Sequence, residues 1–92
     1  MLSVTATLRF WAAAREAAGT AEETVGAATL AGALDEAVRR RGGDDGRGAE
    51  LRRVLARSSV LLDGVQVGRA NPESVQLPDG AVVEILPPFA GG

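Results

Sequence analysis

The C-terminal part of the sequence constrains the fold most, because a strand is predicted there close to the last residue. Ala81–Leu86 alternates with a period of two, as a half-buried strand does. Pro78-Asp79-Gly80 precedes it and has the residues of a tight turn, since proline presets φ and glycine permits an unusual exit. Val83 and Ile85 are predicted to face the core. The residues of opposite parity then face outward: Val82, Glu84 and Leu86.

Beyond this strand the sequence reads Pro87-Pro88-Phe89-Ala90-Gly91-Gly92. Two prolines favour an extended start, and two glycines without Cβ atoms can enter a channel that excludes larger residues. Six extended residues reach at most about 20 Å, roughly the depth of an enzyme active site. We therefore interpret residues 87–92 as a flexible tail that presents a C-terminal carboxylate. The alternative is a frayed terminus without a function.

Composition limits the chain to one small domain and excludes several classes of function. With 92 residues, 46% of them hydrophobic but only 3% aromatic, the core must consist mainly of Leu, Val and Ala. A net charge of −2 gives no general attraction to nucleic acid or to an anionic membrane. There is no cysteine and no apolar run of the ~18–20 residues that span a bilayer. We expect a cytoplasmic protein.

Four residue types that carry much of enzyme chemistry are missing: His, Cys, Tyr and Lys. Without them the commonest nucleophiles and general bases near neutral pH are absent, so the chain is not expected to be catalytic alone. A metal would have only carboxylates, and Glu22-Glu23 and Asp44-Asp45 are adjacent pairs in predicted surface segments, so no metal site is expected. Because all ten cations are arginine, no side chain can accept an isopeptide bond.

The first strand is predicted over Leu2–Phe10, with Leu2, Val4, Ala6, Leu8 and Phe10 on the core face. The other face then carries Ser3, Thr5, Thr7 and Arg9, and Trp11 follows on this polar side. Two interpretations of Trp11 stay open. It packs into a small satellite cluster where the chain turns, or it is an exposed anchor for a partner, since tryptophan is enriched at interface hot spots.

The middle of the chain is predicted to add a helix between short elements. Ala12–Ala18 forms one or two helical turns that stop at Gly19, and Glu22–Val25 forms a strand antiparallel to the first. Thr29 caps the main helix, in which Asp35–Arg39 and Glu36–Arg40 are favourable i,i+4 pairs. Its apolar stripe consists of Leu30, Leu34, Ala37 and Val38. Arg39-Arg40-Arg41 is interpreted as a solvated helix end and not as a nucleic-acid patch, because no aromatic residues accompany it.

A glycine-rich loop and a hairpin complete the chain. Residues 42–48 are predicted to be a flexible surface loop without a nucleotide role, because the Lys-Ser/Thr ending of a phosphate-binding loop is missing. Ala49–Ala56 is predicted to be a short helix with Leu51, Val54 and Leu55 inward. Ser59–Leu62 and Val65–Val67 flank Asp63-Gly64, which strongly indicates a β-hairpin.

These elements predict an α+β fold with one mixed sheet packed on one main helix. With a Gly-Gly end, the layout resembles a ubiquitin-like β-grasp, with residues 1–86 as the domain and 87–92 as the tail. Two motifs resemble the molybdopterin synthase small subunits, sulfur carriers of the MoaD/ThiS family. Residues 10–19, Phe-Trp-Ala-Ala-Ala-Arg-Glu-Ala-Ala-Gly, resemble that family's F-F-A-x-x-R-E-x-x-G, with tryptophan in place of the second phenylalanine. Residues 77–92 resemble L-x-D-G-D-x-V-x-x-x-P-P-x-x-G-G, with Ala81 where an acid is common.

The resemblance implies a mechanism. An E1-like enzyme would use ATP to adenylate the Gly92 carboxylate, sulfur transfer would make a thiocarboxylate, and the molybdopterin synthase large subunit would pass the sulfur to a cyclic pterin precursor. Gly91 would give clearance, and this chain would bind no cofactor itself. Partner contacts would come from Trp11, Arg15, Leu86, Pro87, Pro88, Phe89 and Ala90. Open alternatives are a sulfur carrier for thiamine thiazole or cysteine biosynthesis, a ubiquitin-like protein modifier, and a plain binding module.

Overall fold

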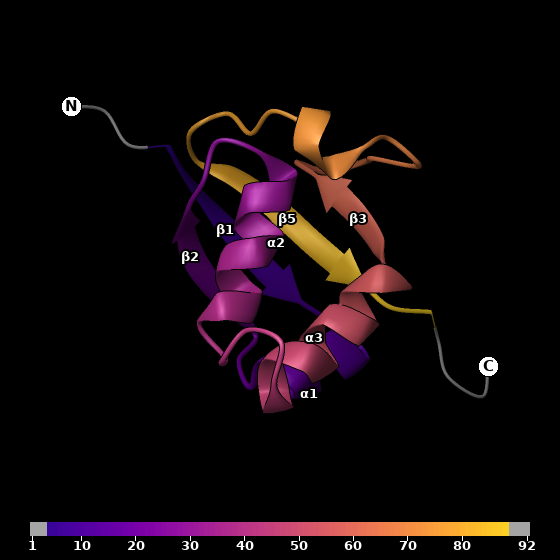
Figure 1. The fold of residues 1–92 in the computed structure, drawn as a ribbon. Coiled ribbons are helices and arrows are strands. Elements are labelled where there is room, and N and C mark those ends of the chain that lie inside the picture. Colours follow the sequence, from indigo (N-terminus) through magenta and orange to yellow (C-terminus); the bar gives the residue numbers. More distant parts are fainter. Residues whose placement is uncertain (1–3, 89–92) are drawn as a thin grey trace.

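Five strands form one mixed sheet in the computed structural model, which describes residues 4–88. The strands lie in the order β2-β1-β5-β3-β4, so the last strand of the chain lies in the middle (Figure 1). β1 and β5 are parallel, whereas the other neighbouring strands are antiparallel. The bounds are β1 Thr5–Phe10, β2 Glu22–Gly26, β3 Ser59–Leu62, β4 Val65–Gln66 and β5 Ala81–Leu86. This arrangement agrees with the predicted α+β class.

In the described part of the chain, three α-helices and a 3-10 helix accompany the sheet. They are α1 Ala12–Ala18, α2 Leu30–Arg39, α3 Gly46–Ala56 and the 3-10 helix η1 Pro72–Ser74. α2 lies across the sheet, and α1 and α3 lie together where β1 and β5 finish (Figure 1). Within residues 4–88, no helix is long and apolar enough to cross a membrane.

The predicted alternation of the two central strands is confirmed. Ala6, Leu8 and Phe10 of β1 are at most 2% exposed, and so are the core-facing residues of β5: Ala81, Val83 and Ile85. Thr5 and Arg9 are exposed on the other face, and the outward residues of β5 are half-buried. Period-2 alternation therefore places one apolar face against the helices. Leu2 and Ser3 lie outside the described residues.

The main helix follows the predicted pattern. The Thr29 hydroxyl accepts a hydrogen bond from the Gly32 amide at 3.1 Å, which satisfies one of the unpaired donors in the first turn. Both predicted i,i+4 ion pairs form, Asp35–Arg39 and Glu36–Arg40, each at 3.3 Å. The buried stripe consists of Leu30, Ala33, Ala37 and Val38, with Leu34 half-buried beside it.

The hairpin between β3 and β4 is also confirmed. Leu62 pairs with Val65, so the loop has two residues, Asp63 and Gly64, with φ of 49° and 86°. Positive φ at both positions is the geometry that Asp-Gly hairpins favour. The Asp63 carboxylate also accepts a hydrogen bond from the Val82 amide at 2.9 Å, which ties the turn to β5.

The prediction of a flexible loop over residues 42–48 was wrong for its second half, because α3 begins at Gly46 and not at Ala49. Gly48 is buried in the first turn of the helix. A Cβ atom there would lie 2.0 Å from the Gly43 carbonyl oxygen, so only glycine permits this close approach. Packing between two backbone segments thus overrides the low helix propensity of glycine.

The prediction of a solvated helix end was wrong for Arg41, whose side chain is only 10% exposed. Its guanidinium pairs with Glu23 on β2 and donates hydrogen bonds to the carbonyls of Ala18 and Ala37, at 2.7 and 2.8 Å. It also lies over the Phe10 ring, 5.7 Å from the centroid. Glu23 has the parity of the buried face of β2, and a carboxylate placed there needs a paired cation. Arg41 therefore joins the ends of α1 and α2 to β2.

Candidate functional site

The candidate site lies where β1 and β5 finish side by side. The parallel register places Phe10 opposite Ile85, and the Trp11 amide donates a hydrogen bond to the Ile85 carbonyl at 3.2 Å. Pro87 is buried next to this pair of strands, and Pro88 is exposed. The chain leaves the sheet at this point (Figure 1). The predicted site residues Phe89, Ala90, Gly91 and Gly92 lie outside the described residues.

Trp11 lies on the outward side at the end of β1 and is 44% exposed. Its indole N–H donates to the Glu84 carboxylate at 3.2 Å, and the Arg9 guanidinium lies over the ring, 5.7 Å from the centroid. The Trp11 carbonyl also accepts from the Ala14 amide at 2.9 Å, so the residue caps α1. The backbone N–H and C=O of Trp11 are thus both hydrogen-bonded, while much of its ring is exposed to solvent.

The residue after Trp11 has a strained backbone. Ala12 has a φ of 49°, one of two positive values at non-glycine residues within 4–88. For an alanine this left-handed conformation costs about 1 kcal/mol. The sharp turn lets α1 start directly after β1 and leaves Trp11 at the edge where β5 also finishes.

Two leucines extend the apolar surface next to Trp11. Continuing the β1–β5 register by one residue places Trp11 beside Leu86, and Leu61 of β3 lies opposite Glu84, on the same face. Leu61 and Leu86 are both half-buried. We call Trp11, Leu61 and Leu86 the tail-base patch. Sequence reasoning missed Leu61, because Val60, Leu61 and Leu62 form a continuous apolar run whose faces are fixed only by pairing with β5.

Charged residues surround the tail-base patch. The nearest N–O distance between Arg9 and Glu22 is 3.9 Å, and since both side chains are well exposed this pair contributes little stability. Arg15 on α1 is exposed, and among residues 4–88 it takes part in no ion pair. Together with Arg9 and Trp11 it lines a small hollow of about 150 Å³. The structure thus brings the predicted contact residues Trp11, Arg15 and Leu86 to one end of the sheet.

The chemistry of this site is that of a binding surface. In the part of the chain that the structure describes, no group of three or more acidic, histidine or cysteine side chains could hold a metal ion. An apolar patch with arginines and carboxylates at its border can contact a protein surface of complementary charge. These side chains can therefore hold a partner at the base of the tail.

Comparison of the sequence with known families gives one match. The model of the ThiS family matches residues 8–92. The match includes all the described site residues, from Arg9 at the end of β1 to Pro88. No curated protein matches the chain in sequence.

Solved structures resemble the whole fold. Small archaeal modifier protein 1 from Methanosarcina acetivorans superposes with a TM-score of 0.77 at 20% identity, over 100% of both chains. A putative molybdopterin converting factor subunit 1 from Pyrococcus furiosus gives 0.71 at 21% identity, over 95% of this chain and 100% of that one. A complex of subunits 1 and 2 of molybdopterin-converting factor from Helicobacter pylori gives 0.63 at 19% identity, over 97% and 100%. At identities this low, the TM-scores establish a shared fold and nothing more. The shared fold confirms the predicted ubiquitin-like β-grasp.

Proposed function

Since the chain belongs to the ThiS family, we propose that it is a sulfur carrier whose C-terminal Gly92 carries the sulfur as a thiocarboxylate. The observation that carries this proposal is the placement of β5. This strand lies between β1 and β3, finishes beside the tail-base patch and leads into the Gly-Gly end. A rigid central strand is a suitable support for a reactive group that must enter another protein in a fixed pose.

Activation of the carboxyl group would take place on a partner, an E1-like adenylating and sulfurtransferase enzyme that binds the ATP. A carboxylate oxygen of Gly92 attacks the α-phosphorus, and pyrophosphate leaves to give the acyl-adenylate. A sulfur nucleophile supplied by the partner system then attacks the carbonyl carbon, and AMP leaves. The chain contributes no side-chain nucleophile or base to these steps, in keeping with its lack of His, Cys, Tyr and Lys.

We further propose that the acceptor is a cyclic pterin precursor, held by a molybdopterin synthase large subunit. Support comes from the resemblance of residues 10–19 and 77–92 to small-subunit motifs and from the similar fold of the Helicobacter pylori complex, which contains two subunits. In this proposal Gly91 gives clearance in the active-site channel. Contacts with the partner come from Trp11, Arg15, Leu86, Pro87, Pro88, Phe89 and Ala90.

A second candidate function is that of a protein modifier. The similarity to small archaeal modifier protein 1, with a TM-score of 0.77, favours it. In that case the activated Gly92 would be joined to lysine side chains of target proteins. Because this chain has no lysine, it could not extend a chain of its own copies through a side chain. Carriers for thiazole or cysteine biosynthesis are the remaining alternative, and they share the same activated end.

A reconstituted transfer reaction tests the choice of acceptor. The thiocarboxylated chain would be mixed with a purified molybdopterin synthase large subunit and the cyclic pterin precursor, and dithiolene formation would be followed. We expect the thiocarboxylate to be consumed in step with the appearance of product. A thiocarboxylate that persists with no product would contradict the molybdopterin assignment. Lysine-linked adducts of the chain in cell extracts would favour the modifier function.

A further inference from the structure

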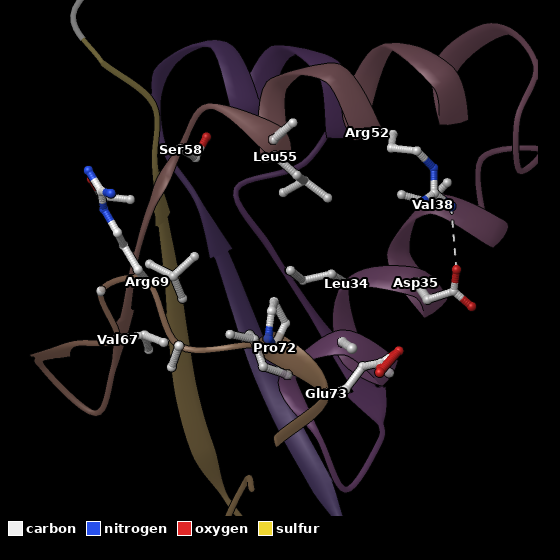
Figure 2. A pocket seen from close by; sticks show the side chains of 18 of the residues that line it. Leu34, Asp35, Val38, Arg52, Leu55, Ser58, Val67, Arg69, Pro72 and Glu73 are labelled. Atoms are coloured by element: carbon white, nitrogen blue, oxygen red, sulfur yellow. Dashed lines mark hydrogen bonds and ion pairs between the residues drawn. The ribbon is translucent and has the colours of Figure 1, made fainter. Parts of the chain in front are cut away.

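A larger hollow lies on the helix side of the sheet and has no role in the proposed function. It has a volume of about 830 Å³ and lies between α2, the end of α3, the start of β3 and the segment from β4 to η1 (Figure 2). We call it the helix-side groove. Its apolar floor includes Leu34, Leu55, Val60 and Val67, which pack against the core but are only half-buried. Apolar area is thus left open to water here, and covering it would be favourable.

The charges at the border of the groove are distributed unevenly. On the helix side Asp35 and Arg52 satisfy each other, with an N–O distance of 3.4 Å that Figure 2 marks as a dashed line. On the side of the β4–η1 segment lie Arg69 and Glu73. Among residues 4–88 neither of them takes part in an ion pair. Figure 2 shows these two side chains apart, with Pro72 between them, so they do not neutralise each other.

The apolar floor and the charges of Arg69 and Glu73 together indicate what kind of molecule the groove can bind. A neutral small molecule would contact neither charge at the border, and a singly charged one would pair with only Arg69 or only Glu73, both of which are exposed. A short polypeptide segment can place apolar side chains on the floor and present an anion to Arg69 and a cation to Glu73. An amphipathic segment laid into a hydrophobic groove is a common mode of peptide recognition.

The groove also reaches the base of the tail. Ser59 lines the groove, and in the sheet it pairs with Leu86, the last residue of β5. A protein that holds the residues after Pro88 is therefore close enough to contact the groove with another segment. Such a second contact would hold the domain while the tail reacts, and two linked contacts bind more tightly than either one alone.

We propose that the helix-side groove docks an amphipathic segment of the adenylating enzyme, which presents an acidic side chain to Arg69 and a basic one to Glu73. This inference rests on the proposed function, because it requires a partner that activates Gly92. The adenylating enzyme is the suitable partner for a test, since sulfur transfer and protein modification both need it. The groove and the tail-base patch would then contact the same enzyme from opposite faces of the sheet.

ATP–pyrophosphate exchange by the purified adenylating enzyme, measured against the concentration of the full chain, tests the proposal. Arg69→Glu and Glu73→Arg are each expected to raise the half-saturating concentration about tenfold, as the loss of a charge contact at an interface does. The maximal exchange rate should not change, because the tail is intact. Matched controls are Arg53→Glu and Glu50→Arg, which make the same charge changes on exposed α3 residues outside the groove. They should behave as the unmodified chain does.

Failure of the docking proposal can be distinguished from failure of the proposed function. If the unmodified chain supports no exchange, the carrier function itself is overturned. If it supports exchange but the groove variants match their controls, only the docking proposal is overturned. Thermal unfolding of each variant shows whether the fold is intact.

Photocrosslinking is a second test of the docking proposal, and it does not depend on the charge variants. A benzophenone amino acid at Ala70, an exposed residue at the border of the groove, should crosslink to an enzyme peptide that contains apolar, acidic and basic residues. The same group placed at Glu50 should not. Equal crosslinking from both positions would contradict docking in the groove.

Discussion

The two faces of the sheet differ in what holds their side chains. On the helix side, Leu8 and Val83 are 0% exposed and belong to one continuous hydrophobic core. On the open side, Arg9, Trp11 and Glu84 are held by a hydrogen bond and a cation–π contact, and Trp11, Leu61 and Leu86 lie near the base of the tail. The fold is therefore stabilised mainly from one face, so the other face can be altered for binding without unfolding the domain.

Deletion of Gly92 should have the largest functional effect and no structural one. Without this residue the chain would end at Gly91, and the carboxyl group would no longer reach the same position in the adenylating enzyme. We expect exchange and sulfur transfer to be lost, while the free energy of unfolding stays within about 0.5 kcal/mol of the original. Unchanged transfer by the shortened chain would show that the reactive group lies elsewhere.

Leu8→Ala tests the helix-covered face. Leu8 is 0% exposed, and removing its side chain leaves a cavity, so we expect a loss of about 3 kcal/mol in urea unfolding. Thr7→Ala is the matched variant on the open face and should cost less than about 1 kcal/mol. Similar losses at the two positions would show that the open face contributes as much to stability as the covered one.

Arg41→Ala tests the partly buried ion pair between Arg41 and Glu23 of β2. Glu23 is only 14% exposed in the structure and would keep only its longer contact with Arg40, at 3.8 Å, so we expect about 2 kcal/mol of destabilisation, less than for a fully buried pair. Arg39→Ala is the control, because Arg39 is 66% exposed and its pairs are worth little. Denaturation of the two variants in parallel measures the difference. Equal stabilities would mean that Arg41 acts only as a surface charge.

Leu86→Asp tests the tail-base patch and should have only a small effect on the fold. Leu86 points to the open side and is half-buried, so we expect unfolding to cost about 1 kcal/mol. Binding to the adenylating enzyme, measured by calorimetry, should weaken about tenfold, because a charge would enter an apolar contact. Val65→Asp, at a 70% exposed position on the edge strand, should leave affinity unchanged. Extensive unfolding of the Leu86 variant would contradict the separation of the two faces.

Local rules were sufficient to predict much of the fold. The Asp63-Gly64 hairpin, the Thr29 cap and the faces of β1 and β5 follow from turn chemistry, capping and period-2 alternation, and all three are confirmed. What could not be predicted depends on tertiary contacts that local sequence patterns do not show. Gly48 lies in the first turn of α3 because it packs on the backbone of Gly43, and Arg41 is only 10% exposed because Glu23 lies across from it.

In the candidate site, too, local rules predicted some features and others depended on the register of the strands. Parity predicted that Leu86 and Trp11 lie on the outward side, whereas the Trp11–Glu84 hydrogen bond joins residues 73 positions apart and needed the register of β1 on β5. Leu61 joined the tail-base patch through its pairing with Glu84. The parity of Glu23, shared with Val25, was the one signal that could have identified the partner of Arg41 from the sequence.

Intact-mass spectrometry tests the central claim most directly. The purified chain would be incubated with the adenylating enzyme, ATP and a sulfur donor, and its mass would be compared with that of a sample without ATP. The account predicts that one oxygen atom is replaced by sulfur and that fragmentation places the change at Gly92. An unchanged mass under conditions in which the enzyme activates an authentic carrier would contradict it.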